Sequence, residues 1–251
     1  MIRRLIILLL IVGCEEETAL EQALAEVEQE IEDCAGVAGG DAVSDIDRNC
    51  YSTIQIGEQL WMAENLRVTH FNNGDEITYP GDEDWGSNDE GQYGIYDNDS
   101  TNADIYGNLY NWAVVNDIRG ICPEEFYVPT DEKFMQLEIA LGMIEQDAER
   151  TNWRGSDEGD MLKIIGTSHW NYSLNSEATN ESGFTALPGG FRVDNLGFYS
   201  GISSFGYYWT ASEDSESTNN AWRRNLSYDR SDIYRTSCHK KMGYSIRCLK
   251  D

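Results

Sequence analysis

Residues 183–213, GFTALPGGFRVDNLGFYSGISSFGYYWTASE, contain the clearest structural pattern in the chain. The LPGG segment at 187–190 predicts a turn, because proline fixes its own φ and glycine adopts positive φ without steric cost. Two short strands are expected around the polar break Asp194-Asn195. The run YYWT at 207–210 has the aromatic and β-branched composition of a half-buried strand. We expect the later strands to pack around this stretch.

The segments outward from this stretch predict separate strands and helices. Residues 51–56 and 60–66 predict a hairpin around Gly57-Glu58. Thr130 is a good N-cap for a helix that Gly142 can end, whereas residues 72–104 are polar and predict a long loop. Because strands and helices do not alternate as βαβ units, the fold class is predicted to be α+β, with a mostly antiparallel sheet, one or two helices and long loops.

Charge excludes one class of partner. The 251 residues carry a formal charge of −27, which repels nucleic acids and anionic lipids. Two explanations of this acidity are open: it keeps the protein soluble, or it binds a divalent cation. Cation binding alone needs carboxylates that converge on one point. Asp97, Asp99 and Asp104 superficially resemble a calcium loop, but the glycine and glutamate of an EF-hand are missing. No cofactor is expected, with a looser calcium site as the alternative.

The N-terminus predicts export. Residues 1–13 combine Arg3 and Arg4 with a continuous apolar run that is too short to span a bilayer, which needs roughly 20 residues. The following Ile11-Val12-Gly13-Cys14 resembles the lipobox of bacterial lipoproteins, whose cysteine receives the lipid. An ordinary signal peptide followed by a chance cysteine is the alternative. Lipid on Cys14 would anchor the protein to a membrane without spanning it.

Residues 14–44 predict an acidic tether. Acidic residues at 15–17 resemble a surface-display signal of Bacteroidetes lipoproteins, or are only a solvated tether. Leu20, Leu24, Val27 and Ile31 share one face of a stalk helix, and the Gly-rich residues 35–41 predict a linker. The globular domain is expected at 45–251, as a monomer displayed on the outer membrane.

Six cysteines are present without a C-x-x-C pair or zinc-ligand spacing. Disulfides are their expected use in an exported protein. If Cys14 carries lipid, five remain, so at least one is free or pairs between chains.

Catalytic motifs are missing from the sequence. Its three histidines, His70, His169 and His239, have no identifiable partner, and no H-E-x-x-H, G-x-S-x-G, P-loop or G-x-G-x-x-G pattern occurs. We therefore expect a protein that is not an enzyme, although paired carboxylates for glycoside cleavage are an alternative in so acidic a chain.

Aromatic, Asn and Gly residues are typical of adaptable recognition surfaces. Aromatic faces can stack on sugars, and nearby amides and carboxylates can bind hydroxyls. Tyr208, Trp209 and Trp222 are better explained as core, whereas the loop at 214–220 is the expected variable surface. The candidate ligand-binding residues are Tyr199, Tyr207, Asp214, Glu216, Asn219, Asn220 and Arg223.

Ordered sequence blocks over 45–251 resemble the Fibrobacter succinogenes major paralogous domain. They include WMAENL at 61–66, GICP at 120–123, ALPGGFR at 186–192, YWTASE at 208–213 and GYSIRC at 243–248. This resemblance implies an exported protein, often a lipoprotein, without an assigned activity.

The family is in turn similar to the C-type-lectin-like fold, which implies a Cys122–Cys248 disulfide between the first helix region and the last strand. The calcium motifs of sugar-binding lectins and the close cysteine pair of sulfatase activators are both missing. Together these features predict a lipid-anchored surface protein that binds an extracellular glycan. A protein ligand and a structural surface coat are the alternatives.

Overall fold

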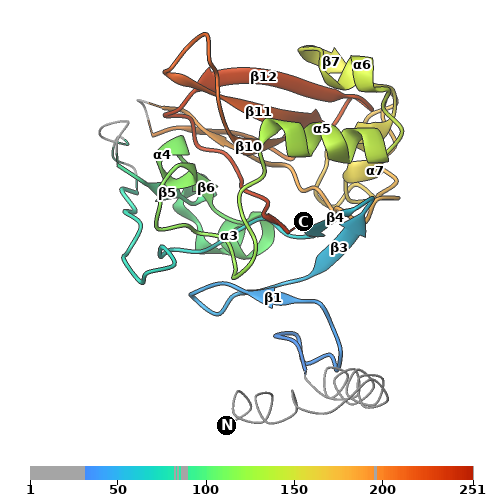
Figure 1. Cartoon of the computed structure of the whole chain (residues 1–251). Coiled ribbons are helices and arrows are strands. Elements are labelled where there is room, and N and C mark those ends of the chain that lie inside the picture. The colour runs from blue at the N-terminus through green and yellow to red at the C-terminus, as the bar shows by residue number, and fades with distance from the viewer. Residues whose placement is uncertain (1–31, 82, 84, 86–89, 195–196, 251) are drawn as a thin grey trace, which may run out of the picture.

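The largest sheet is built around the stretch that the sequence singled out. The structure is a computed structural model that describes residues 32–81, 83, 85, 90–194 and 197–250 (Figure 1). The strand order in this sheet is β7-β12-β11-β10-β8-β9, and all its neighbours are antiparallel except β8 and β10. These strands are β7 (Asn152–Arg154), β8 (Gly189–Arg192), β9 (Tyr199–Ile202), β10 (Phe205–Glu213), β11 (Asn220–Ser227) and β12 (Ile233–His239).

Strand β10 separates two hydrophobic cores. Successive side chains of a strand point to opposite faces, and Tyr208 and Trp209 are both buried. Trp209 packs with Tyr110 and Tyr244 in one cluster, whereas Tyr208 packs with Trp61 in the other. The aromatic run is therefore buried on both sides, which explains its lack of a polar face.

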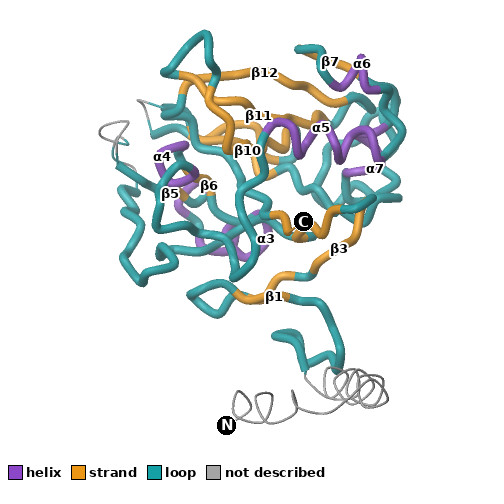
Figure 2. The backbone as a smooth tube through the Cα atoms, viewed as in Figure 1, coloured by secondary structure: helices purple, strands orange, loops and turns teal. Residues whose placement is uncertain are grey.

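Three smaller sheets complete the fold. The predicted hairpin is confirmed: β3 (Thr53–Ile56) pairs with β4 (Gln59–Met62) across Gly57, which has a φ of 60°. Strand β13 (Leu249–Lys250) adds to the other edge of β4. The C-terminal strand thus lies beside the start of the domain (Figure 2). The remaining pairs are β1 (Val43–Ser44) with β2 (Cys50–Tyr51) and β5 (Tyr93–Gly94) with β6 (Leu109–Tyr110).

Helix α5 (Asp131–Ala140) is the longest helix of the described residues, and Thr130 caps it as predicted by accepting from the Lys133 amide. The α+β class is therefore correct. The described residues contain five α-helices rather than one or two, because short helices interrupt the connections. The others are α3 (Ser100–Tyr106), α4 (Trp112–Val115), α6 (Glu145–Ala148) and α7 (Glu158–Leu162).

Two segments predicted as loop or linker have regular structure. Residues 72–104 include β5, a 3₁₀ helix at Tyr96–Asn98 and the start of α3, which Asp99 caps. Residues 35–41 fold around the Asp33 carboxylate, which accepts from the amides of Ala35, Val37 and Ala42. Side-chain capping stabilises such turns without an apolar pattern, which explains why hydrophobic periodicity missed them. No helix in the described residues is long and apolar enough to cross a membrane.

A buried ionic network joins α5 to the large sheet. Arg224 of β11 lies 2.5 Å from Asp131 and 2.7 Å from Glu138. Arg235 of β12 pairs with Asp131 at 2.6 Å, and Arg154 of β7 pairs with Glu138. Burial alone would raise the pKa of the Asp131 carboxyl, but hydrogen bonds and charge from Arg235 and Arg224 hold it below its ordinary value.

Two disulfides fix distant parts of the chain. Cys122 is bonded to Cys248, the pairing that the family resemblance implies, and Cys34 is bonded to Cys50. Cys238 is the free cysteine of the described residues. Cys122–Cys248 spans 126 residues and Cys34–Cys50 spans 16, so the first closes by far the longer loop.

Removing the long-range disulfide should destabilise the protein more than removing the short one. The chain-entropy relation gives about 4–5 kcal/mol for a loop above a hundred residues and about 3 kcal/mol for one near fifteen. We expect both double variants to have a lower free energy of unfolding. The loss should be larger for Cys122→Ser with Cys248→Ser than for Cys34→Ser with Cys50→Ser. Denaturant titration measures both, with Cys238→Ser as control. Mass mapping that finds Cys122 free in an oxidised sample contradicts the pairing.

Acid should weaken the fold in part through Asp131. Its folded-state pKa is lowered, so its contribution is fully present above its unfolded pKa of about 3.9 and is lost as the pH falls through the folded value. Asp131→Asn should therefore flatten the pH dependence of unfolding below about pH 4. At neutral pH it should cost about 3–5 kcal/mol, because two arginines lose their carboxylate. An unchanged acid slope measured by denaturant titration would contradict this role.

Candidate functional site: a cleft beside helix α7

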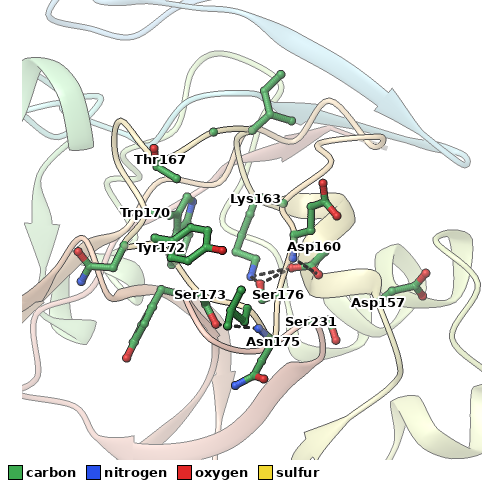
Figure 3. A pocket seen from close by; sticks show the side chains of 17 residues that line it. Asp157, Asp160, Lys163, Thr167, Trp170, Tyr172, Ser173, Asn175, Ser176 and Ser231 are labelled. Atoms are coloured by element: carbon green, nitrogen blue, oxygen red, sulfur yellow. Dashed lines mark hydrogen bonds and ion pairs between the residues drawn. The ribbon is translucent and has the colours of Figure 1, made fainter.

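A cleft lies between α7, the loop that follows it, and the connection from β11 to β12 (Figure 3). Its volume is about 880 Å³. We call it the loop cleft, because residues 165–178 supply most of its wall. The wall comprises Asp157, Asp160, Lys163, Ile165, Gly166, Thr167, residues 170–178, Tyr228 and Ser231.

A buried ion pair holds the loop in place. The Lys163 side chain is 1% exposed, and its Nζ lies 2.7 Å from Asp160 Oδ1. It also donates to Ser176 Oγ and to the carbonyls of Ser227 and Arg230. Asp160 in turn accepts from Ser176 Oγ at 2.7 Å and from the Glu177 amide at 3.0 Å. Figure 3 shows the contacts among Lys163, Asp160 and Ser176 at one side of the cleft.

The ammonium group of Lys163 is fully occupied by these contacts. An ammonium has three protons to donate, and Lys163 has four oxygen partners within hydrogen-bond distance. Burial lowers the pKa of Lys163, and Asp160 acts in the opposite direction. The charge is thus compensated inside the protein, and the group positions the loop rather than reaching into the cleft.

Apolar and aromatic side chains form one part of the wall. Trp170 is buried, and its Nε1 donates to the Ala186 carbonyl at 3.0 Å. Tyr172 is 70% exposed, Leu174 is 87% exposed and Ile165 is 61% exposed. The Tyr172 ring is open to solvent, and its loop is anchored by a buried ion pair. The ring can therefore contact a ligand without a rearrangement of the core.

Polar groups surround these side chains. Asn171 donates to Ser204 Oγ at 3.0 Å, and Ser173 Oγ accepts from the Asn175 amide at 3.0 Å. Asp157 and Glu177 are exposed carboxylates of the same wall. Amide, hydroxyl and carboxylate groups beside an exposed aromatic ring match the chemistry of polyhydroxylated ligands, which have both apolar faces and many hydrogen-bonding groups.

A second cleft, of about 590 Å³, is lined by His70, which pairs with a carboxylate outside the lining. His70 Nδ1 lies 2.6 Å from Asp47 Oδ1, and Tyr79 stacks on Tyr93 in the same wall. Partial burial alone would raise the pKa of Asp47, but bonds from Thr69 and His70 lower it. His70 therefore has a partner, Asp47, which the sequence alone did not identify.

The predicted ligand-binding residues fall outside the loop cleft. Tyr207 is half-buried, stacks on Tyr244 with ring centres 5.0 Å apart, and packs against the core. Arg223 lies over the Tyr207 ring at 4.9 Å and donates to Asn225. These contacts indicate that Tyr207 and Arg223 pack within the sheet and against the C-terminal segment.

The loop at 214–220 is the turn between β10 and β11. Asp214 accepts from Ser237 Oγ and from the Glu216 amide, and its own amide donates to the Asn220 carbonyl. Glu216 and Asn219 are exposed. Tyr199 lies on β9, where its hydroxyl donates to Asn98 Oδ1 at 3.2 Å. The turn is accessible as expected, and whether it binds a ligand stays a prediction.

The three aspartates of the suggested calcium site have separate local roles. Asp97 lies in the 3₁₀ helix, and Asp99 caps α3 by accepting from the amide and hydroxyl of Thr101. Asp104 lies within α3. Across the described part of the chain, no group of three or more His, Cys, Asp or Glu side chains is placed to hold a metal ion. Cys14, the predicted lipidation site, lies outside the described residues.

Comparison with known proteins assigns the chain to a family. The fold and the cleft define an α+β domain with an open, polar and aromatic recess. The Fibrobacter succinogenes major domain matches residues 54–250, and the chain belongs to this family. The comparisons with curated proteins and with solved structures gave no match.

Lys163 should control the order of the cleft loop. Lys163→Met removes the partner of buried Asp160 and should cost about 3–5 kcal/mol, with faster proteolysis within residues 165–178. Ser176→Ala should cost about 1 kcal/mol, because it removes a hydroxyl hydrogen bond. Lys250→Met, at an ion pair with exposed Glu125, is the control and should cost less than about 1 kcal/mol. Equal losses for both lysine variants would contradict the anchoring role.

Proposed function

We propose that this protein is a non-catalytic glycan-binding module anchored to the outer cell surface. Lipid on Cys14 would hold it at the membrane, and residues 32–44, joined to the domain by the Cys34–Cys50 disulfide, would connect the tether to the domain. The strongly acidic chain disfavours nucleic acid and anionic lipid as partners.

The exposed Tyr172 ring in the wall of the loop cleft is the observation that carries the proposal. Aromatic side chains provide large, rigid contact area at low entropic cost. The neighbouring Asn171, Ser173 and Asn175 provide the amides and hydroxyls that sugar hydroxyls need. Because the sheet and the Lys163 ion pair fix the loop, little ordering entropy is lost on binding.

Binding without catalysis fits the titratable groups of this cleft. The ammonium group of Lys163 lies within hydrogen-bond distance of four oxygens, and in this protonated form it has no lone pair to act as a base. Asp160 already accepts from Ser176 and from the Glu177 amide. These two groups support the wall, and the residues open to a ligand are mainly aromatic, aliphatic and neutral polar ones.

A protein ligand is the second candidate, and one observation favours it. Leu174 and Ile165 are exposed aliphatic side chains in the same wall as Tyr172. Aliphatic side chains contribute more to protein interfaces than to sugar recognition, where aromatic rings stack on the ligand. Substitution of Tyr172 and of Leu174 in separate variants therefore distinguishes a glycan ligand from a protein ligand.

Tyr172→Ala should weaken glycan binding without destabilising the fold. We expect a loss of at least about tenfold in affinity, equivalent to about 1.4 kcal/mol, and an unchanged melting temperature because the ring is mostly exposed. A glycan array with calcium and with a chelator selects the glycan, and calorimetry then measures the affinity. Phe198→Ala is the matched control, because Phe198 is 63% exposed outside the cleft.

The opposite pattern would favour a protein ligand. If no glycan binds in either buffer, or if Tyr172→Ala binds as tightly as the unmodified chain, the proposed glycan site is wrong. Capture of a surface protein that depends on Leu174 and Ile165 would then support the second candidate.

A further inference from the structure

The loop cleft has a net negative wall. Three of its lining residues are acidic, namely Asp157, Asp160 and Glu177, and one is basic, namely Lys163. Lys163 and Asp160 neutralise each other at 2.7 Å inside the wall. The charges left exposed toward solvent are therefore the carboxylates of Asp157 and Glu177.

The flanking residues do not reverse this charge. Asp229 and Asp232 act electrostatically on Lys163, in the direction that raises its pKa, so they lie near the same wall. Arg230 donates to both oxygens of Asp232, at 2.7 and 2.8 Å. One carboxylate of this connection, Asp229, therefore adds to the negative field. Its carboxylate accepts from the hydroxyl of Ser227 and has no ion pair of its own among the described residues, although Lys163 and Arg230 lie near enough to act on it electrostatically.

The long-range field has the same sign. The chain carries 45 acidic and 18 Lys or Arg residues, so an approaching anion is repelled before it reaches the cleft. Cationic ligands are attracted over distances of about a Debye length, roughly 8–10 Å at physiological salt. An anionic saccharide is thus disfavoured both at long range and by the wall.

We propose that the loop cleft selects glycans with protonated amino groups, such as β-1,4-linked glucosamine oligomers. The inference rests on the proposed glycan-binding function and adds the charge class of the ligand. Tyr172 contacts an apolar face of a sugar ring, the amides of the loop bind hydroxyls, and Asp157 and Glu177 accept from the ammonium groups. Charge-assisted hydrogen bonds of this kind are stronger than neutral ones.

The test compares four hexasaccharides of similar length on the full chain by calorimetry. They are glucosamine, N-acetylglucosamine, glucose and galacturonate oligomers, measured at a pH where glucosamine is protonated. We expect the glucosamine hexamer to bind at least about tenfold more tightly than its N-acetylated counterpart, with an affinity that falls as salt is added. The galacturonate hexamer should bind most weakly.

Isosteric substitutions identify the carboxylates responsible. Asp157→Asn with Glu177→Gln should remove most of the preference for glucosamine and its salt dependence, and leave the N-acetylglucosamine affinity unchanged. Glu58→Gln is the control, because Glu58 is an exposed carboxylate in the β3–β4 turn, outside the cleft. It should change neither affinity.

The outcomes separate this inference from the function on which it rests. Equal or tighter binding of N-acetylglucosamine, still lost in Tyr172→Ala, overturns the charge selectivity and retains the glycan site. A glucosamine preference that survives the double substitution also overturns the inference, because other carboxylates would then be responsible. If no saccharide binds and a lysine-rich peptide does, both the inference and the proposed function are wrong.

Discussion

The network between α5 and the large sheet is the interaction on which the rest of the structure depends. Its two carboxylates, Asp131 and Glu138, lie on one helix, and their arginine partners come from β7, β11 and β12. Breaking a buried ion pair costs about 3–5 kcal/mol, because a charge is left uncompensated. Burial lowers the pKa of Arg154 to about 10, so this arginine still carries its charge at neutral pH. The helix is thereby fixed in register against three strands, and the short β7 is kept at the edge of the sheet.

The C-terminal segment provides the second constraint, because it joins the two ends of the domain. Cys248 is bonded to Cys122, and Leu249 pairs with Trp61 on β4. Immediately before Cys248, the buried Arg247 donates to Asn65 Oδ1 at 2.7 Å and to the Met62 carbonyl at 3.1 Å. These bonds join the WMAENL and GYSIRC blocks by which the sequence resembles its family. The blocks thus mark a shared scaffold, and scaffold positions carry no information on a ligand.

Sequence patterns predicted the elements whose stability comes from local chemistry or a distinctive composition. The Gly57 hairpin, the Thr130 cap and the aromatic strand at 207–210 were all found, because turn geometry, capping and the aromatic and β-branched composition of a strand act within a few residues. The short helices and the Asp33 turn were missed. Helices α3 and α4 and the Asp33 turn depend on single capping side chains such as Asp99, and a capping residue in a polar region is no different in composition from a loop residue.

The loop cleft was missed for a different reason, because its residues come together only through tertiary contacts. Residues 171–180, NYSLNSEATN, are polar and predict a loop, and the one local signal was Tyr172 and Leu174 among Asn and Ser. The loop takes its position from Lys163, whose partners at Ser227 and Arg230 lie more than sixty positions later in the chain. Tyr207 was predicted to bind a ligand because an aromatic residue in a strand can serve as a stacking surface, and that prediction did not include its contacts with neighbouring side chains. Stacking on Tyr244 buries much of the Tyr207 ring, whereas Tyr172 stays exposed because its loop is held by a charge pair beneath it and not by its own ring.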